Sequence, residues 1–91
     1  MKDLPEGVTP YKQTPDFTED TVPPGLLRAH STKAGTWGLI VVEQGRLRYR
    51  ILEPEIEELV LEPGTPGIVE PTVLHEVEPL GPVRFRVVFH R

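Results

Sequence analysis

Residues 36–52, TWGLIVVEQGRLRYRIL, carry the pattern that decides the fold class. In the second half of this stretch, arginines alternate with apolar residues: Arg46, Leu47, Arg48, Tyr49, Arg50 and Ile51. Successive side chains of a β-strand point to opposite faces, so the alternation predicts a strand with a buried face and a solvated outer face, on which the arginines pair with nearby glutamates. Residues 36–42 are largely apolar and rich in β-branched side chains, which predicts a second strand. The intervening residues 43–45, Glu-Gln-Gly, predict a hairpin turn.

The rest of the chain shows short strand patterns separated by turn residues. The sequence contains 11 prolines and 8 glycines, and they predict turns at residues 63–67 and 79–82. Further strands or extended segments are predicted over residues 25–31, 58–63, 67–71, 74–78 and 83–90. Short strands at this spacing are typical of an all-β fold, and we predict a small closed barrel. The prediction is one domain over residues 1–91, with an extended N-terminal wrap over 1–24 and the barrel over 25–90.

Composition and charge argue against several classes of partner and of chemistry for this protein. A net charge of −4 argues against a nucleic-acid partner, because such a partner requires a basic surface. No stretch resembles a signal peptide or reaches the length of a membrane span, so we expect a cytoplasmic protein without a membrane partner. The absence of cysteine excludes disulfides, thiolate metal ligands and cysteine nucleophiles. Abundant Glu, Arg and Pro without any Asn favour a heat-adapted, thermophile source.

Two histidines are the candidate site residues. His30 has the strand parity of Leu26, and His75 has the parity of Val77, so both are predicted to point inward. Imidazole is the commonest metal ligand and titrates near neutral pH, which makes such a pair suitable for a metal or substrate site. The alternative is that each is a core histidine whose ring is hydrogen-bonded to a backbone carbonyl or a carboxylate. His90 has the opposite parity to its apolar neighbour and is predicted to point outward.

The remaining candidates flank the two histidines. A metal site needs further ligands, and Glu70 and Glu78 are the candidates. Glu78 faces away from His75 on a regular strand, so it can join the site only where the strand bends or bulges. Lys33 is a candidate for contact with an anion, with a solvated loop lysine as the alternative. Trp37 is a candidate pocket residue, with a core or rim aromatic as the alternative.

Two segments carry a resemblance to a known family. Residues 30–38, HSTKAGTWG, and 69–78, VEPTVLHEVE, resemble the small cupin-like domain found at the N-terminus of tellurite-resistance TehB proteins and in short YeaR-type bacterial proteins. The resemblance runs from about residue 5 to residue 89. It implies a cupin-like double-stranded β-helix (jelly-roll) barrel, with His30 and His75 as ligands of one divalent transition metal: zinc, nickel, iron or manganese. The three-histidine, one-glutamate set of many cupins is incomplete here, because Thr32 or Lys33 and then Gly38 stand where those cupins have a histidine and a glutamate.

Three functional hypotheses follow from the residues and the resemblance. The first is a binding module that holds a metal ion or a small anion, or another small molecule, in a stress or tellurite response. The second is a structural domain that forms a homodimer without a ligand. The third is a metal-dependent oxygenase or isomerase, for which the sequence offers no identifiable acid–base pair. In TehB proteins methyl transfer belongs to a separate domain, so this chain is not expected to be a methyltransferase by itself.

Overall fold

The fold is all-β, as the alternating sequence pattern predicts. The computed structural model describes residues 3–91. The elements are β1 (Pro10–Gln13), β2 (Phe17–Thr18), the 3-10 helix η1 (Pro24–Leu27), β3 (Trp37–Ile51), β4 (Glu57–Leu61), β5 (Gly67–Val69) and β6 (His75–His90). Within residues 3–91, no helix has the length and apolar character needed to cross a bilayer.

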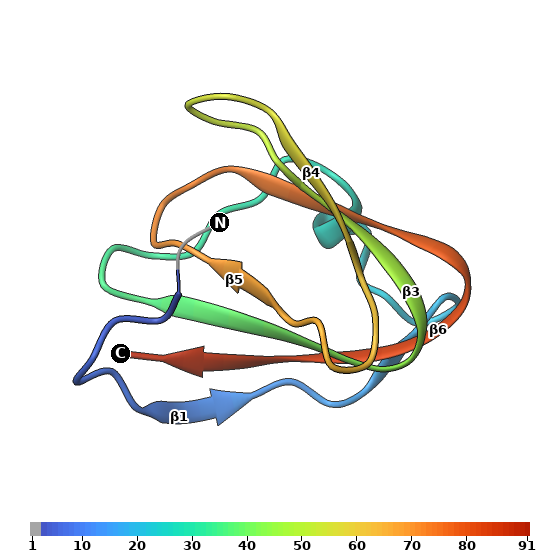
Figure 1. The fold of residues 1–91 in the computed structure, drawn as a ribbon, viewed down its shortest axis with the longest axis horizontal. Helices are drawn as coiled ribbons and strands as arrows, with labels where there is room; N and C mark the ends of the chain where they lie inside the picture. The colour runs from blue at the N-terminus through green and yellow to red at the C-terminus, as the bar shows by residue number, and fades with distance from the viewer. Residues whose placement is uncertain (1–2) are drawn as a thin grey trace.

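Two long strands form the frame of the molecule. β3 and β6 run antiparallel along most of their length, and Figure 1 shows them curving together around one side of the fold. The predicted hairpin turn at residues 43–45 is therefore wrong, because these residues lie inside β3. The predicted turn at residues 79–82 is wrong for the same reason, since it lies inside β6.

Both mispredicted turns are places where the long ladder changes register. The pairing of β3 with β6 shifts between Val42 and Gln44 and again between Gly45 and Leu47. Gly45 has a positive φ of 77°, and a Cβ atom there would overlap the carbonyl oxygen of Pro82 on the facing strand. Extra residues in a ladder bend and twist a strand without ending it. The glycine therefore produces a bulge that bends both strands together, and no hairpin forms.

The sheet is antiparallel and open. Its hydrogen-bonded strands follow the order β1-β6-β3-β4, while β2 pairs with β6 and β5 pairs with β3. Within the described residues this path starts at β1 and ends at β4, which do not pair with each other, so the predicted closed barrel is wrong. The bends in β3 and β6 let the sheet wrap around its core while its two edges stay apart (Figure 1).

The N-terminal segment adds strands to this sheet. β1 pairs with the end of β6 and β2 pairs with its middle, where Phe17 lies opposite Phe85. Within the predicted N-terminal wrap over residues 1–24, residues 1–2 lie outside the described part of the chain. The prediction of an extended segment over residues 25–31 is wrong for its first three residues, which belong to η1.

The core follows the alternation seen in the sequence. On β3 the apolar residues at 47, 49 and 51 are buried, and the arginines lie on the other face. There Arg48 contacts Glu58 on β4 and Glu78 on β6, with N–O distances of 2.8 and 2.7 Å. The buried apolar cluster is Ile40, Val42, Leu47, Tyr49, Ile51, Leu61, Val69, Val77, Val83, Phe85 and Val87.

Candidate functional site

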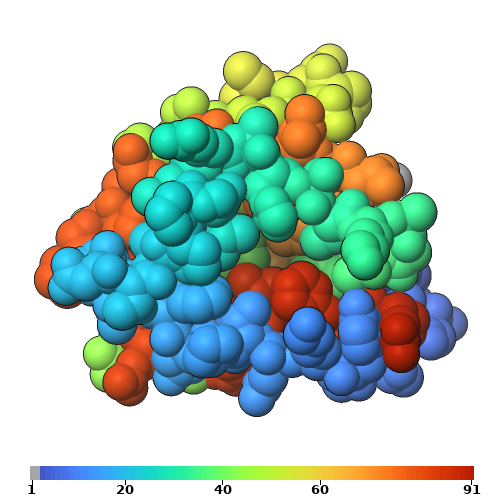
Figure 2. All heavy atoms as spheres, turned by 180° about the vertical axis from the view of Figure 1, so that it is seen from behind, coloured from blue at the N-terminus to red at the C-terminus, as the bar shows by residue number. Residues whose placement is uncertain are grey.

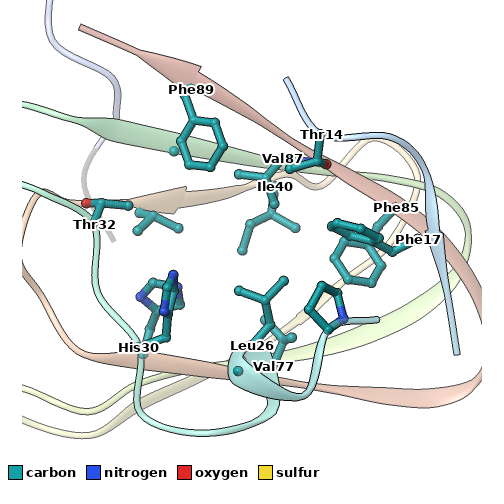
Figure 3. Close-up of a pocket in the computed structure, with 15 residues that line it drawn as sticks. Thr14, Phe17, Leu26, His30, Thr32, Ile40, Val77, Phe85, Val87 and Phe89 are labelled. Carbon is teal, nitrogen blue, oxygen red and sulfur yellow. The ribbon is translucent and has the colours of Figure 1, made fainter. Parts of the chain in front are cut away.

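The inner side of the bent sheet encloses an apolar cavity. Its volume is about 260 Å³, and β2, η1, β3, β5 and β6 all contribute to its lining. Figure 3 shows Phe17 and Phe85 at one end of this cavity and His30 and Thr32 at the other. Apart from the two histidines, the described side chains that line the cavity carry no titratable group. The cavity is therefore a largely apolar chamber with both histidines at one end, while the hydroxyl-bearing Thr14 lies toward the end formed by Phe17 and Phe85 (Figure 3).

His30 and His75 lie side by side at the polar end. Their backbones form an isolated antiparallel bridge, in which each residue's N–H donates to the other's carbonyl oxygen at 2.8 Å. Their ring centroids are 5.5 Å apart, with the rings edge to face at 78°. The two imidazoles, distant in the sequence, are thus held at one place by the backbone itself.

His75 is the buried member of the pair. Its residue is only 4% exposed, and its ring packs edge to face on Tyr49 with centroids 5.8 Å apart. Its Nδ1 lies 3.2 Å from the carbonyl oxygen of Val73, so we assign the proton to Nδ1, which leaves Nε2 with a free lone pair. Burial lowers the pKa of His75 below its ordinary value, nearby His30 lowers it further, and the Val73 carbonyl partly opposes both. A neutral imidazole with one free nitrogen is the form that binds a metal ion.

His30 is the exposed member of the pair. It follows η1, and strand parity does not relate it to Leu26 as predicted, because Leu26 lies in η1 and not in a strand. Both residues nevertheless line the cavity. His30 also lines a second pocket outside the cavity, so it stands between the apolar chamber and solvent.

The two candidate glutamates do not join the histidines. Glu78 lies on the outer face of β6, where its carboxylate pairs with Arg48. Glu70 lines a different pocket, together with Ile51. Burial raises the pKa of Tyr49, and the negative charge of Glu70 raises it further. In residues 3–91, no group of three or more His, Asp or Glu side chains is arranged to hold a metal ion.

Trp37 and Lys33 occupy different places. Trp37 begins β3 opposite His90, and it does not line the cavity. Lys33 is exposed and lines the second pocket, which also has a volume of about 260 Å³. That pocket includes Lys12 of β1, which sequence reasoning missed because only the pairing of β1 with β6 brings it near the loop after His30.

His90 is buried, which corrects the prediction that it points outward to solvent. It is 8% exposed, and its Nδ1 lies 3.2 Å from the carbonyl oxygen of Val88. The reason is the position of β6, which lies inside the sheet between β1 and β3, so that His90 has Pro10 on one side and Trp37 on the other. His90 does not line the cavity.

The chain is similar to known proteins over most of its length. A family model described as "TehB-like domain" matches residues 12–87. A Haemophilus influenzae protein named "Probable S-adenosyl-L-methionine-dependent methyltransferase TehB" is 36% identical over 74 residues, which cover 77% of this chain and 26% of that protein. Its counterpart in a second strain of Haemophilus influenzae is 35% identical over the same coverage. The chain thus spans about a quarter of the length of these curated relatives.

Solved structures show the same fold. TehB from Haemophilus influenzae superposes with a TM-score of 0.86 at 32% identity, over 93% of this chain and 32% of that chain. A protein from Escherichia coli K12 superposes with a TM-score of 0.89 at 21% identity, over 100% of this chain and 97% of that one, and this likeness concerns the fold alone. Because the family model covers residues 12–87 and a crystal structure of TehB shares the fold, the chain belongs to the family of TehB-like domains.

Proposed function

We propose that this TehB-like domain is a binding module, in which His30 and His75 hold a divalent transition metal or a small anion at the end of the cavity. The observation that carries the proposal is the bridge that brings two imidazoles from distant segments together at that end. The neutral state favoured for His75 supports a metal such as zinc, nickel, iron or manganese, which needs an unprotonated ring nitrogen.

The proposal assigns binding, and not catalysis, to the site. Two histidines fill only part of a usual first coordination shell, so the bound species or water would supply the other ligands. The methyltransferase activity named for Haemophilus influenzae TehB is not assigned to any residue of this chain. We place the module beside that activity, in a cytoplasmic stress or tellurite response, where a small anion such as tellurite is a natural probe.

A titration with matched histidine variants tests the proposal. Metal-free protein is titrated calorimetrically with zinc, nickel, manganese and ferrous salts, and separately with tellurite. At least one of these should bind, and His75→Gln and His30→Gln should each weaken its binding by tenfold or more. His90→Gln is the control, because His90 is buried away from the cavity and should leave binding unchanged. Equal binding by all three variants, or no binding by the unaltered protein, would contradict the proposal.

The cupin relationship is part of the same proposal. We infer that the open sheet is a reduced form of the cupin jelly roll, with the segment after His30 and the segment before His75 in the places of the two cupin motifs. The bends shared by β3 and β6 support this inference, because they turn two long strands around a common core as the strands of a jelly roll turn.

A ligand-free dimerisation domain is the second candidate function. Within residues 3–91, β4 is an edge strand whose one partner is β3, and its outward-facing Val60 is 46% exposed. Nearby Ile56 is 71% exposed, and an apolar sheet edge is suited to pairing with a second copy. On this hypothesis the molar mass measured by light scattering rises from monomer to dimer with concentration, and Val60→Lys shifts the equilibrium toward monomer. A monomer at every concentration would exclude it.

A further inference from the structure

We infer that the cavity and the second pocket form one site for a small organic anion, with its apolar body in the cavity and its charged group between Lys12 and Lys33. This inference rests on the proposed binding function and names the class of ligand. It concerns the region between the loop after His30, the start of β1 and the end of β6. Figure 2 shows the surface hollowed between the teal segment around residue 30 and the red end of β6, with the blue N-terminal segment beside them.

The two pockets adjoin each other. His30, Thr32 and Phe89 line both of them, so the same three residues form the boundary between the apolar chamber and the outer pocket. In Figure 3, His30 and Thr32 lie at one end of the cavity, away from Phe17 and Phe85. A ligand that enters past these residues would therefore contact both pockets at once.

The cavity suits an apolar group. Its walls include Ile40, Val77 and Val87, and in the part of the chain that the structure describes no Asp, Glu, Lys or Arg side chain lines it. Moving an apolar group from water into such a chamber is favourable in proportion to the apolar area removed from water.

The second pocket suits an anionic group. Lys12 and Lys33 both line it, and none of the acidic side chains among residues 3–91 does. Neither lysine forms an ion pair within residues 3–91, so each ammonium group is available to a ligand. The guanidinium of Arg91 lies 4.1 Å from the centre of the Tyr11 ring, which lines the same pocket. Two lysines that face the same pocket, in a chain with a net charge of −4, favour an anion there by charge complementarity.

The loop that carries Lys33 is already ordered. The backbone N–H of Thr36 donates to the carbonyl oxygen of Lys33 at 3.0 Å. The hydroxyl of Thr32 donates to the carbonyl oxygen of Thr36 at 2.8 Å. These two bonds hold the loop as a closed turn, so binding an anion there would require little additional ordering of the backbone.

Three small probes distinguish the parts of this site. Phenylacetate has both an apolar ring and a carboxylate, 2-phenylethanol has the ring without the charge, and acetate has the charge without the ring. Binding is followed by NMR through the methyl signals of Ile40 and Val87 and the amide signals of residues 32–36. We expect phenylacetate to shift both sets of signals and to bind at least tenfold more tightly than either of the other probes.

Charge-removing variants complete the test. Lys12→Gln combined with Lys33→Gln should weaken phenylacetate binding at least tenfold and leave 2-phenylethanol unaffected. The matched control is Arg46→Gln, because Arg46 is an exposed cation that lines neither pocket. This variant should bind phenylacetate and 2-phenylethanol as the unaltered protein does. The inference is overturned if phenylacetate binds no better than 2-phenylethanol, if the lysine variant binds it normally, or if no probe binds.

The outcome can be separated from that of the proposed metal binding. The metal titration is repeated on the variant that lacks both lysines, which leaves His30 and His75 in place. Normal metal binding without any phenylacetate binding by the unaltered protein would overturn only this inference. Phenylacetate binding that depends on the lysines, in a protein that binds no metal, would support this inference and contradict only the metal hypothesis.

Discussion

At the scale of single residues, Tyr49 supports the buried histidine. Its hydroxyl donates a hydrogen bond of 2.8 Å to the carbonyl oxygen of Ile68, and its ring packs against His75. Burial raises the pKa of Tyr49, and the charges of Glu70 and Glu57 raise it further, so the hydroxyl stays protonated and remains a donor. Tyr49 therefore links β5, which carries Ile68, to the ring at the polar end of the cavity.

Removing this hydroxyl should destabilise the fold. Tyr49→Phe keeps the ring but loses the donor to a buried carbonyl, and we expect the free energy of unfolding to fall by about 1 kcal/mol. The measurement is equilibrium unfolding in urea. Tyr11→Phe is the matched control, because Tyr11 is exposed and should lose no stability. Equal stability of Tyr49→Phe and the unaltered protein would show that the hydrogen bond contributes nothing.

The site residues could be predicted from the sequence only where a strand is regular. His75 shares a face with Val77 on β6, and parity alone places both inside. His30 follows the 3-10 helix η1 and lies outside the named strands, and its ring reaches the cavity because the backbone bridge to His75 holds it. His90 has outward parity, but a strand pairs on each side of it and buries it. Burial by neighbouring strands depends on which distant segments pair with a strand, and the alternation within one segment does not predict that pairing.

At the scale of elements, the bend at Gly45 decides the path of β3. Gly45 has a positive φ and approaches the backbone of Pro82 so closely that a Cβ would lie 3.0 Å from its carbonyl carbon. Two separate costs would follow from Gly45→Ala: strain in the left-handed region and a steric overlap with backbone that cannot move aside.

A matched glycine separates these costs. Gly64→Ala also forces an alanine to a positive φ, of 88°, but among the described residues no further atom lies within 4 Å of its added Cβ. We expect Gly64→Ala to lower the free energy of unfolding by about 1 kcal/mol, and Gly45→Ala to lower it by at least about 2 kcal/mol more. Urea unfolding of both variants measures the difference. If the two variants lose the same stability, the close approach of the two bent strands does not matter to the fold.

The error in predicting a hairpin here has a physical cause. A glycine between two strand patterns is compatible both with a tight turn and with a bulge, because both need a positive φ. The choice is made by the partner strand: β6 is long enough to pair with both halves of β3, and its own irregularity around residues 79–82 faces that of β3. The sequence thus predicts where the regular strand geometry is interrupted, but not whether the chain reverses its direction at that point.

At the scale of the whole molecule, the all-β fold class could be predicted from the sequence, and the openness of the sheet could not. Alternating patterns fix which faces are apolar, and a chain of 91 residues has room for one core. Whether two edge strands meet depends on the accumulated bend of β3 and β6, which depends on the register shifts between them. The resulting open sheet leaves β4 as an edge and leaves room for the cavity beside η1.

Stability of the whole molecule should depend on pH through His75. Burial of this ring, with the charge of His30 as a smaller cause, lowers the pKa of His75 in the folded state below its ordinary value of 6.5. Between the ordinary pKa and this lowered one, the unfolded chain binds a proton at His75 that the folded protein still excludes. The stability that the neutral ring contributes is therefore fully present above about pH 6.5. It is lost as the pH falls from there through the lowered pKa that His75 has in the folded protein.

We accordingly expect the free energy of unfolding to fall between about pH 7 and pH 5.5, with a slope of at most about 1.4 kcal/mol per pH unit from this residue. Urea unfolding across this range measures the slope. His75→Gln removes the group and should flatten this part of the dependence, whereas His90→Gln, which changes a buried histidine outside the cavity, should keep it. A metal ion bound to the neutral ring would steepen the slope, because protons and metal compete for the same nitrogen. If His75→Gln retains the full slope, the loss of stability arises elsewhere and His75 is not held neutral by its burial.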